Sequence, residues 1–118
     1  MATNEVFEYG RKLSVVCTDP ATPASGDPVL YGQRPGVALT DENTTTGETS
    51  VQFDGVWDLS VKGIDGGGNS AVAKGDILYY VAADTPKLSK KTTGVRFGYA
   101  NETVTSGATA TIQVIVGY

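Results

Sequence analysis

Two aspartates flank the single tryptophan of this chain and are the first residues to test for chemistry. Asp54 and Asp58 lie on either side of Trp57, which could combine paired carboxylates with an aromatic platform for a sugar. Residues four apart on a strand share a face but lie about 13 Å apart, at ~3.3 Å per residue. That separation is too large for either glycosidase geometry. We therefore interpret Asp54 as a turn residue and Asp58 as a solvent-facing strand residue.

The chain has no histidine and one cysteine, Cys17. The most common general base and metal ligand is therefore missing, and one thiol forms neither an internal disulfide nor a thiolate zinc site. We interpret Cys17 as a small buried hydrophobic residue. The glycine-rich segment 65–69 lacks the ligand spacing of a calcium loop and the Gly-Lys-Ser/Thr of a phosphate loop. We predict no catalytic residue, no cofactor and no metal site.

Three lysines, Lys87, Lys90 and Lys91, form a small basic cluster near Pro86. The cluster has two interpretations: a solvated turn, or a patch that meets an acidic protein surface. The whole chain carries 9 basic and 13 acidic residues, a net charge of −4. Nucleic acids and anionic membranes attract the opposite charge, so neither is an expected partner.

The length of 118 residues predicts one domain. The longest apolar run, 77–83, is far too short to span a membrane. The first residues show neither the basic nor the apolar region of a secretory signal, so we expect synthesis in a cytoplasm. The 15 glycines and 5 prolines are spread along the chain and separate short segments rich in β-forming residues.

Alternation of apolar and polar residues predicts an all-β fold of about nine short strands, a small barrel or sandwich with essentially no helix. A single helical turn over 70–74 is the one exception that we expect. The non-alternating run 77–81 is predicted to be a strand covered on both faces. The predicted inward-facing residues are Leu13, Val15 and Cys17; Trp57, Leu59 and Val61; Val95, Phe97 and Tyr99; and Ala110, Ile112, Val114 and Val116.

One pattern occurs twice along the chain. A Gly-Asp turn and a strand at 26–31 are followed by Gly-x-Ala at 36–38 and a glycine-led strand at 47–53. The same order returns at 75–80, 98–100 and 107–114. We predict a pseudo-duplicated fold, in which two three-stranded units close on each other.

The ordered set of these motifs resembles a family of small phage capsid cement, or decoration, proteins. The resemblance covers about residues 10–118. No single motif is specific, but their order is, and the loop 63–69 departs from the family pattern. The motifs are Ser-Gly-Asp-Pro-Val at 25–29, Gly-Val-Ala at 36–38, Gly-Glu-Thr at 47–49, Gly-Val-Trp-Asp-Leu at 55–59, Gly-Asp-Ile-Leu-Tyr at 75–79, Gly-Tyr-Ala at 98–100 and the Val-rich strand at 112–116.

The resemblance implies a structural, non-enzymatic virion protein on the outer surface of a tailed-phage head. Cement proteins bind the major capsid protein at junctions between its subunits and stabilise the shell against internal pressure. They often act as trimers, so a homotrimer is an expectation that rests on the resemblance.

Two questions stay open at this point. Residues 1–9 form either the first strand of the domain at 10–118 or an arm that binds the capsid, through Asn4, Val6, Phe7 and Tyr9. The lysine cluster is the second candidate contact. The alternative function is a small β-module of a head or tail fibre that recognises host glycans, with Trp57 and the tyrosines as exposed platforms.

Overall fold

The computed structural model describes residues 12–117, which form strands and no helix. The all-β prediction is confirmed, with eleven strands in the described part where we expected about nine. The strands are β1 (Lys12–Val15), β2 (Pro28–Tyr31), β3 (Arg34–Ala38), β4 (Thr49–Gln52), β5 (Val56–Lys62), β6 (Ile64–Asp65), β7 (Gly68–Asn69), β8 (Ile77–Tyr80), β9 (Leu88–Ser89), β10 (Val95–Ala100) and β11 (Thr109–Val116).

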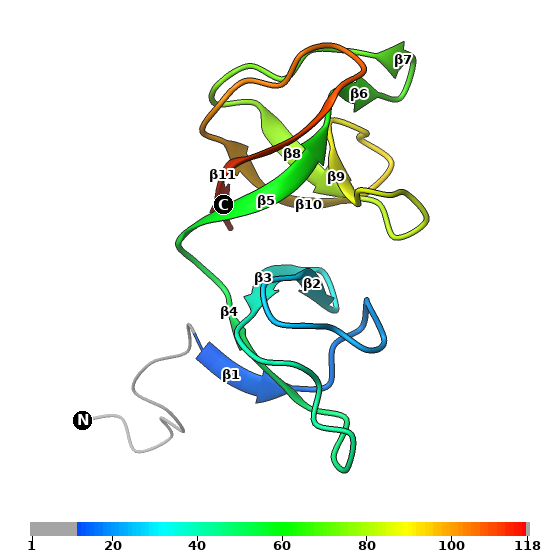
Figure 1. Ribbon diagram of the computed structural model, residues 1–118. Coiled ribbons are helices and arrows are strands. Elements are labelled where there is room, and N and C mark those ends of the chain that lie inside the picture. The colour runs from blue at the N-terminus through cyan, green and yellow to red at the C-terminus, as the bar shows by residue number, and fades with distance from the viewer. Residues whose placement is uncertain (1–11, 118) are drawn as a thin grey trace, which may run out of the picture.

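The chain folds as two repeats, one above the other in Figure 1, joined by the segment between β4 and β5. Repeat 1 (residues 12–53) is a four-stranded sheet in the order β1-β4-β3-β2. Repeat 2 (residues 56–117) has the equivalent order β5-β11-β10-β8, and β9 closes it into a barrel. The duplication is therefore present, but four strands recur in each unit rather than three, and repeat 2 has further strands of its own. Each unit builds its own sheet instead of sharing one.

The Gly-Asp turns of the two repeats are matched bond by bond. Gly26 and Gly75 both adopt a positive φ, of 89° and 86°, which glycine tolerates without strain. The Asp27 carboxylate accepts from the Ala24 amide at 2.9 Å, and the Asp76 carboxylate accepts from the Ala73 amide at 2.8 Å. These side-chain bonds replace backbone partners within the turn, so each aspartate fixes the start of the following strand.

The repeated Gly-x-Ala motif has a packing cause. A Cβ on Gly36 would lie 2.5 Å from a Val51 methyl carbon, and a Cβ on Gly98 would lie 2.0 Å from the Ile115 carbonyl oxygen. In both repeats, only glycine lets this strand approach its neighbour so closely. The alanine two residues later is buried in the core in both cases, as Ala38 and Ala100.

Strand β3 links the two cores. Its inward residue Ala38 belongs to the small core of repeat 1, with Val29, Val51 and Phe53. Val37, on the opposite face, belongs to the larger core that fills the barrel of repeat 2. Residues 35–38 are therefore buried on both faces of the strand. The equivalent strand β10 has a second face that is only half-buried.

The predicted strand faces hold where alternation is regular. The inward sets of β5 and β11 are confirmed, with Trp57 and Ala110 packed at the edge of the core. The strand predicted at 77–81 is confirmed as β8, but it is not covered on both faces, because Leu78 and Tyr80 are buried while Ile77 and Tyr79 are half-exposed. In β10 a bulge between Arg96 and Gly98 inserts Phe97 and reverses the alternation. Phe97 is therefore inward as predicted, but Tyr99 faces outward.

The repeats differ most at one hairpin. Residues 32–33 join β2 to β3, whereas the fourteen residues 81–94 join β8 to β10 and contain β9. Leu88 in β9 pairs with Val61 of β5 in parallel and with Tyr80 of β8 in antiparallel register, which closes the barrel. The predicted helical turn at 70–74 is wrong, because Val72 forms a β-bridge with Val104 instead. Across residues 12–117, no helix long and apolar enough to cross a membrane is found.

Candidate interaction site

The three lysines of the basic cluster all lie in the 81–94 insertion, and each faces an aspartate. The Lys90 ammonium lies 3.6 Å from Asp76, and Lys91 lies 2.9 Å from Asp84. Lys90 also donates to the Ala71 carbonyl at 2.9 Å. Lys90 therefore joins the insertion to the rest of repeat 2, whereas the Lys91–Asp84 pair lies within the insertion. Their side chains stay 26–30% exposed, so they also border solvent.

Lys87 takes part in a clamp between the repeats. Its ammonium lies 3.0 Å from the Asp19 carboxylate of repeat 1, and the Tyr80 hydroxyl of repeat 2 donates to the same oxygen. Burial raises the pKa of Asp19, but the hydrogen bonds from Tyr80 and Lys87 and the Lys87 charge outweigh burial and lower it. The pKa of the Tyr80 hydroxyl is strongly raised by burial and by Asp19, so this group stays a donor.

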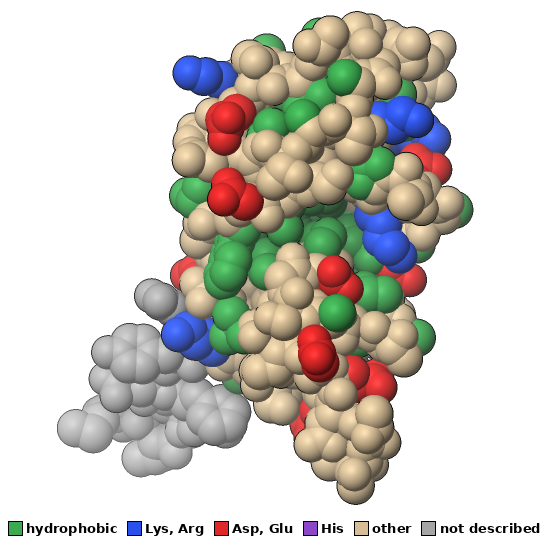
Figure 2. Space-filling model, in the orientation of Figure 1, with side chains coloured by type: hydrophobic (Ala, Val, Ile, Leu, Met, Phe, Trp, Pro, Cys, Tyr) green, Lys and Arg blue, Asp and Glu red, His purple; other side chains and the backbone are tan. Residues whose placement is uncertain are grey.

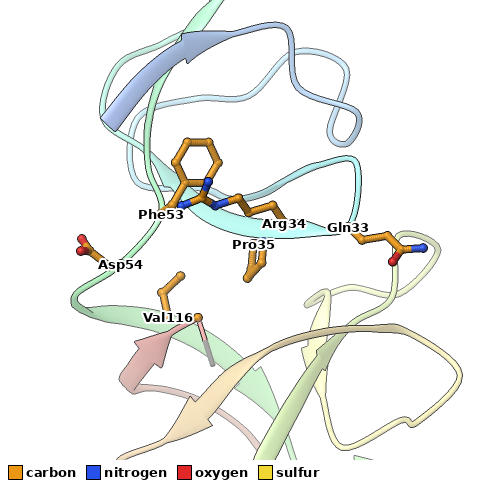
Figure 3. Close-up of a pocket in the computed structure, with 7 residues that line it drawn as sticks. Gln33, Arg34, Pro35, Phe53, Asp54 and Val116 are labelled. Atoms are coloured by element: carbon orange, nitrogen blue, oxygen red, sulfur yellow. The ribbon is translucent and has the colours of Figure 1, made fainter. Parts of the chain in front are cut away.

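A groove of about 450 Å³ opens where the repeats meet, on the side of the connecting segment (Figure 3). Pro35 of β3 and Val116 of β11 point into it from opposite walls. The Arg34 guanidinium lies over the Phe53 ring, 4.4 Å from its centroid, in a cation–π contact. In the view of Figure 2, hydrophobic side chains gather along this waist between the two halves.

Repeat 2 carries a row of apolar side chains on its outer surface. Val56, Ile115, Tyr99 and Ile77 are cross-strand neighbours in successive strands of the barrel, so their side chains share its outer face. Val56 is 57% exposed and Ile115 is 39% exposed. The sequence interpretation missed this row, because the bulge places Tyr99 on the outer face.

Trp57 is a packing residue in repeat 2. Its ring packs against the barrel core, and its indole N–H donates to the Asp54 carbonyl at 2.9 Å. Gly55, with φ of 99°, lies directly beside the indole nitrogen. Asp58 is exposed on the opposite face of β5. The tryptophan therefore has its polar atom satisfied internally, which does not favour the glycan-platform alternative.

Among the described residues, the single cysteine and possible metal ligands are the candidate reactive groups. Cys17 is buried in the core of repeat 1, and this burial raises the pKa of its thiol. The thiolate, which is the nucleophile, is therefore disfavoured. Within residues 12–117 no three His, Cys, Asp or Glu side chains gather as metal ligands would. The predicted contact residues Asn4, Val6, Phe7 and Tyr9 lie outside the described residues.

These features define a class of protein: a small all-β protein of two stacked repeats, with surfaces suited to contact other proteins. Comparison with known families gives the particular identity. A model of the phage cement protein family matches residues 7–116, nearly the whole chain. The chain belongs to the phage cement protein family, which makes it a structural protein associated with a phage capsid. No curated protein and no solved structure gives a significant match.

Proposed function

We propose that this protein binds the outer surface of a tailed-phage capsid, contacts the major capsid protein, and stabilises the shell without catalysing a reaction. The observation that carries the proposal is the family match over residues 7–116. A two-repeat body suits such a role, because its two sheets offer contact surfaces on several sides. A stable contact of this kind needs on the order of 1,200 Å² of buried surface.

Two segments are proposed to contact the capsid. The first is the N-terminal segment 1–9, with the apolar residues Val6, Phe7 and Tyr9 among polar neighbours. An extended segment of this composition can lie across a neighbouring protein or add a strand to its sheet. The second is the lysine cluster of the 81–94 insertion, whose ammonium groups remain partly exposed beside their aspartates.

Co-sedimentation with empty heads of the phage tests the main proposal. The purified protein is mixed with heads before and after expansion, and the pelleted fraction is measured against concentration. We expect saturable binding to expanded heads, together with a higher temperature of disruption of the empty heads, measured by differential scanning calorimetry. Lack of binding to either form, at low and at moderate salt, would refute the capsid role and lead to a glycan screen.

Matched variants then separate the two contacts. Deletion of residues 1–9 tests the arm. Replacement of Lys87, Lys90 and Lys91 by Gln tests the cluster, against a control in which Lys12, Lys62 and Lys74 become Gln and the net charge changes equally. A weaker affinity in the first triple variant alone, with its fold retained by circular dichroism, supports contact through the cluster. Equal weakening in both shows that only the net charge matters.

A further inference from the structure

The duplication places equivalent residues of the two repeats in different surroundings. Counting along the strand registers, the outer face of β2 and β3 in repeat 1 corresponds to the outer face of β8 and β10 in repeat 2. The first of these faces is buried against repeat 2, and the second is half-exposed. The equivalent pairs, with the residue of repeat 1 first, are Leu30 and Tyr79, Pro35 and Arg96, and Val37 and Tyr99.

The half-exposed face has the composition of a binding surface. We call Val56, Ile77, Tyr79, Arg96, Tyr99 and Ile115 the outer face of repeat 2. Tyrosine and arginine are, with tryptophan, the residues enriched at the energetic centres of protein interfaces. The Arg96 guanidinium lies 5.4 Å from the centroid of the Tyr99 ring and donates to the Tyr99 hydroxyl, so both side chains are held in place. The apolar Val56 and Ile115 continue this face across β5 and β11.

The equivalent face of repeat 1, on β2 and β3, packs against repeat 2 of the same chain. Leu30 and Val37 belong to one buried cluster with Tyr80, Phe97 and Val116 of repeat 2. Val116 lines the groove between the repeats, and the Tyr80 hydroxyl donates to Asp19 of repeat 1. By the same register, Tyr80 corresponds to Tyr31 in repeat 1, and Val116 corresponds to Phe53. Tyr31 is 45% exposed.

The outer face of repeat 2 is thus half-exposed, and Tyr31, the counterpart of Tyr80, is exposed as well, whereas Phe53 is buried beneath Arg34. We infer that the outer face of repeat 2 in one copy packs against the exposed Tyr31 and Arg34 of repeat 1 in a second copy, continuing the stacking of the repeats from chain to chain. The exposed Asp58, beside Val56 on the outer face, is the group of opposite charge that can pair with Arg34, which is exposed beside Tyr31. Such a contact is head-to-tail, since it joins two different surfaces.

This inference rests on the internal repeat and stands apart from the capsid role. Two exposed residues allow it to be tested without touching either core: Ile115→Lys alters the outer face, and Tyr31→Lys alters the opposite surface. Thr111→Lys is the matched control, because Thr111 is exposed on the same face of β11, four residues from Ile115. Circular dichroism and thermal unfolding establish that all three variants fold.

Sedimentation velocity over micromolar to millimolar concentrations gives the readout. We expect the wild type and Thr111→Lys to associate, and each of the other two variants to lose at least about tenfold in affinity. An equimolar mixture of Ile115→Lys and Tyr31→Lys should restore a species of two chains, because each variant keeps the surface that the other lacks. Further growth should not occur in the mixture.

Three outcomes would overturn the inference. A wild type that stays monomeric at all concentrations excludes the contact, whether or not it still pellets with phage heads. Association lost in Ile115→Lys but intact in Tyr31→Lys indicates a symmetric contact of two outer faces. Failure of the mixture to form a two-chain species also excludes the head-to-tail contact.

Discussion

Repeat 1 and repeat 2 share strand order, register and turn chemistry, yet only repeat 2 closes into a barrel. The cause is one hairpin, which has two residues in repeat 1 and fourteen in repeat 2. The longer hairpin supplies β9 and with it the fully buried Leu88. Repeat 1 has no such strand in the described residues and buries the outer face of β3 against its neighbour instead. Repeat 2 is therefore completed by an insertion, and repeat 1 is completed by its contact with repeat 2.

The largest effect is expected at the repeated glycines. Gly98→Ala should destabilise the protein by about 3 kcal/mol, because the new Cβ would meet the backbone oxygen of Ile115 at 2.0 Å. Gly36→Ala should cost about 1.5 kcal/mol, since the closest atom is a Val51 methyl carbon that can shift. Urea unfolding measures both. Gly66→Ala is the control, because nothing lies within 4 Å of its Cβ position, and equal losses at Gly36 and Gly98 would contradict the argument.

A smaller effect should separate the two outer faces. Val37→Ala should lower the free energy of unfolding by about 2 kcal/mol, because Val37 is fully buried between the repeats. Tyr99→Ala, at the equivalent position, should cost less than about 1 kcal/mol in dilute protein, since half-burial leaves less to lose. Urea unfolding at low protein concentration is the measurement. A loss at Tyr99 as large as that at Val37 would show that both faces are structural within one chain.

Much of this comparison could be predicted from the sequence. The Gly-Asp and Gly-x-Ala motifs indicated a duplication, because a positive φ and a close strand approach both require glycine at fixed places. Regular alternation placed the inward residues of β5 and β11 correctly. These features depend on neighbours along the chain or on a simple period, which a sequence displays directly.

The errors arose where contacts are distant in sequence. A single inserted residue, Phe97, reversed the facing of Tyr99, and no local signal marks such a bulge. The lysine cluster looked like a free basic patch because its partners Asp19 and Asp76 lie 68 and 14 residues from Lys87 and Lys90. The sequence also did not predict that each unit has its own sheet, because strand pairing is set by the tertiary fold.

The clamp between the repeats, formed by Asp19, Tyr80 and Lys87, should make the stability of the protein depend on pH. The lowered pKa of Asp19 means that its stabilising effect is fully present above about pH 4 and is lost as pH falls through the folded-state value. Asp19→Asn should therefore cost about 1.5 kcal/mol at neutral pH, and the difference from the wild type should shrink in more acidic solution. Thermal unfolding across pH measures this difference. The control is Asp58→Asn, which changes an exposed carboxylate. If Asp19→Asn lowered the stability by the same amount at every pH, the ionised Asp19 would not be the group that stabilises the clamp.

The smallest effect concerns the ion pair that lies wholly within the insertion. Lys91 and Asp84 lie 2.9 Å apart with side chains 30% and 24% exposed, so their coupling should be only about 0.5 kcal/mol and should decrease with added salt. A double-mutant cycle of Lys91→Gln and Asp84→Asn, followed by urea unfolding, isolates this coupling. The cycle of Lys87→Gln and Asp19→Asn should give a larger value, because that pair also involves the Tyr80 hydroxyl and joins the repeats. Equal couplings would mean that the Lys87–Asp19 pair gains nothing from the Tyr80 hydroxyl or from joining the repeats.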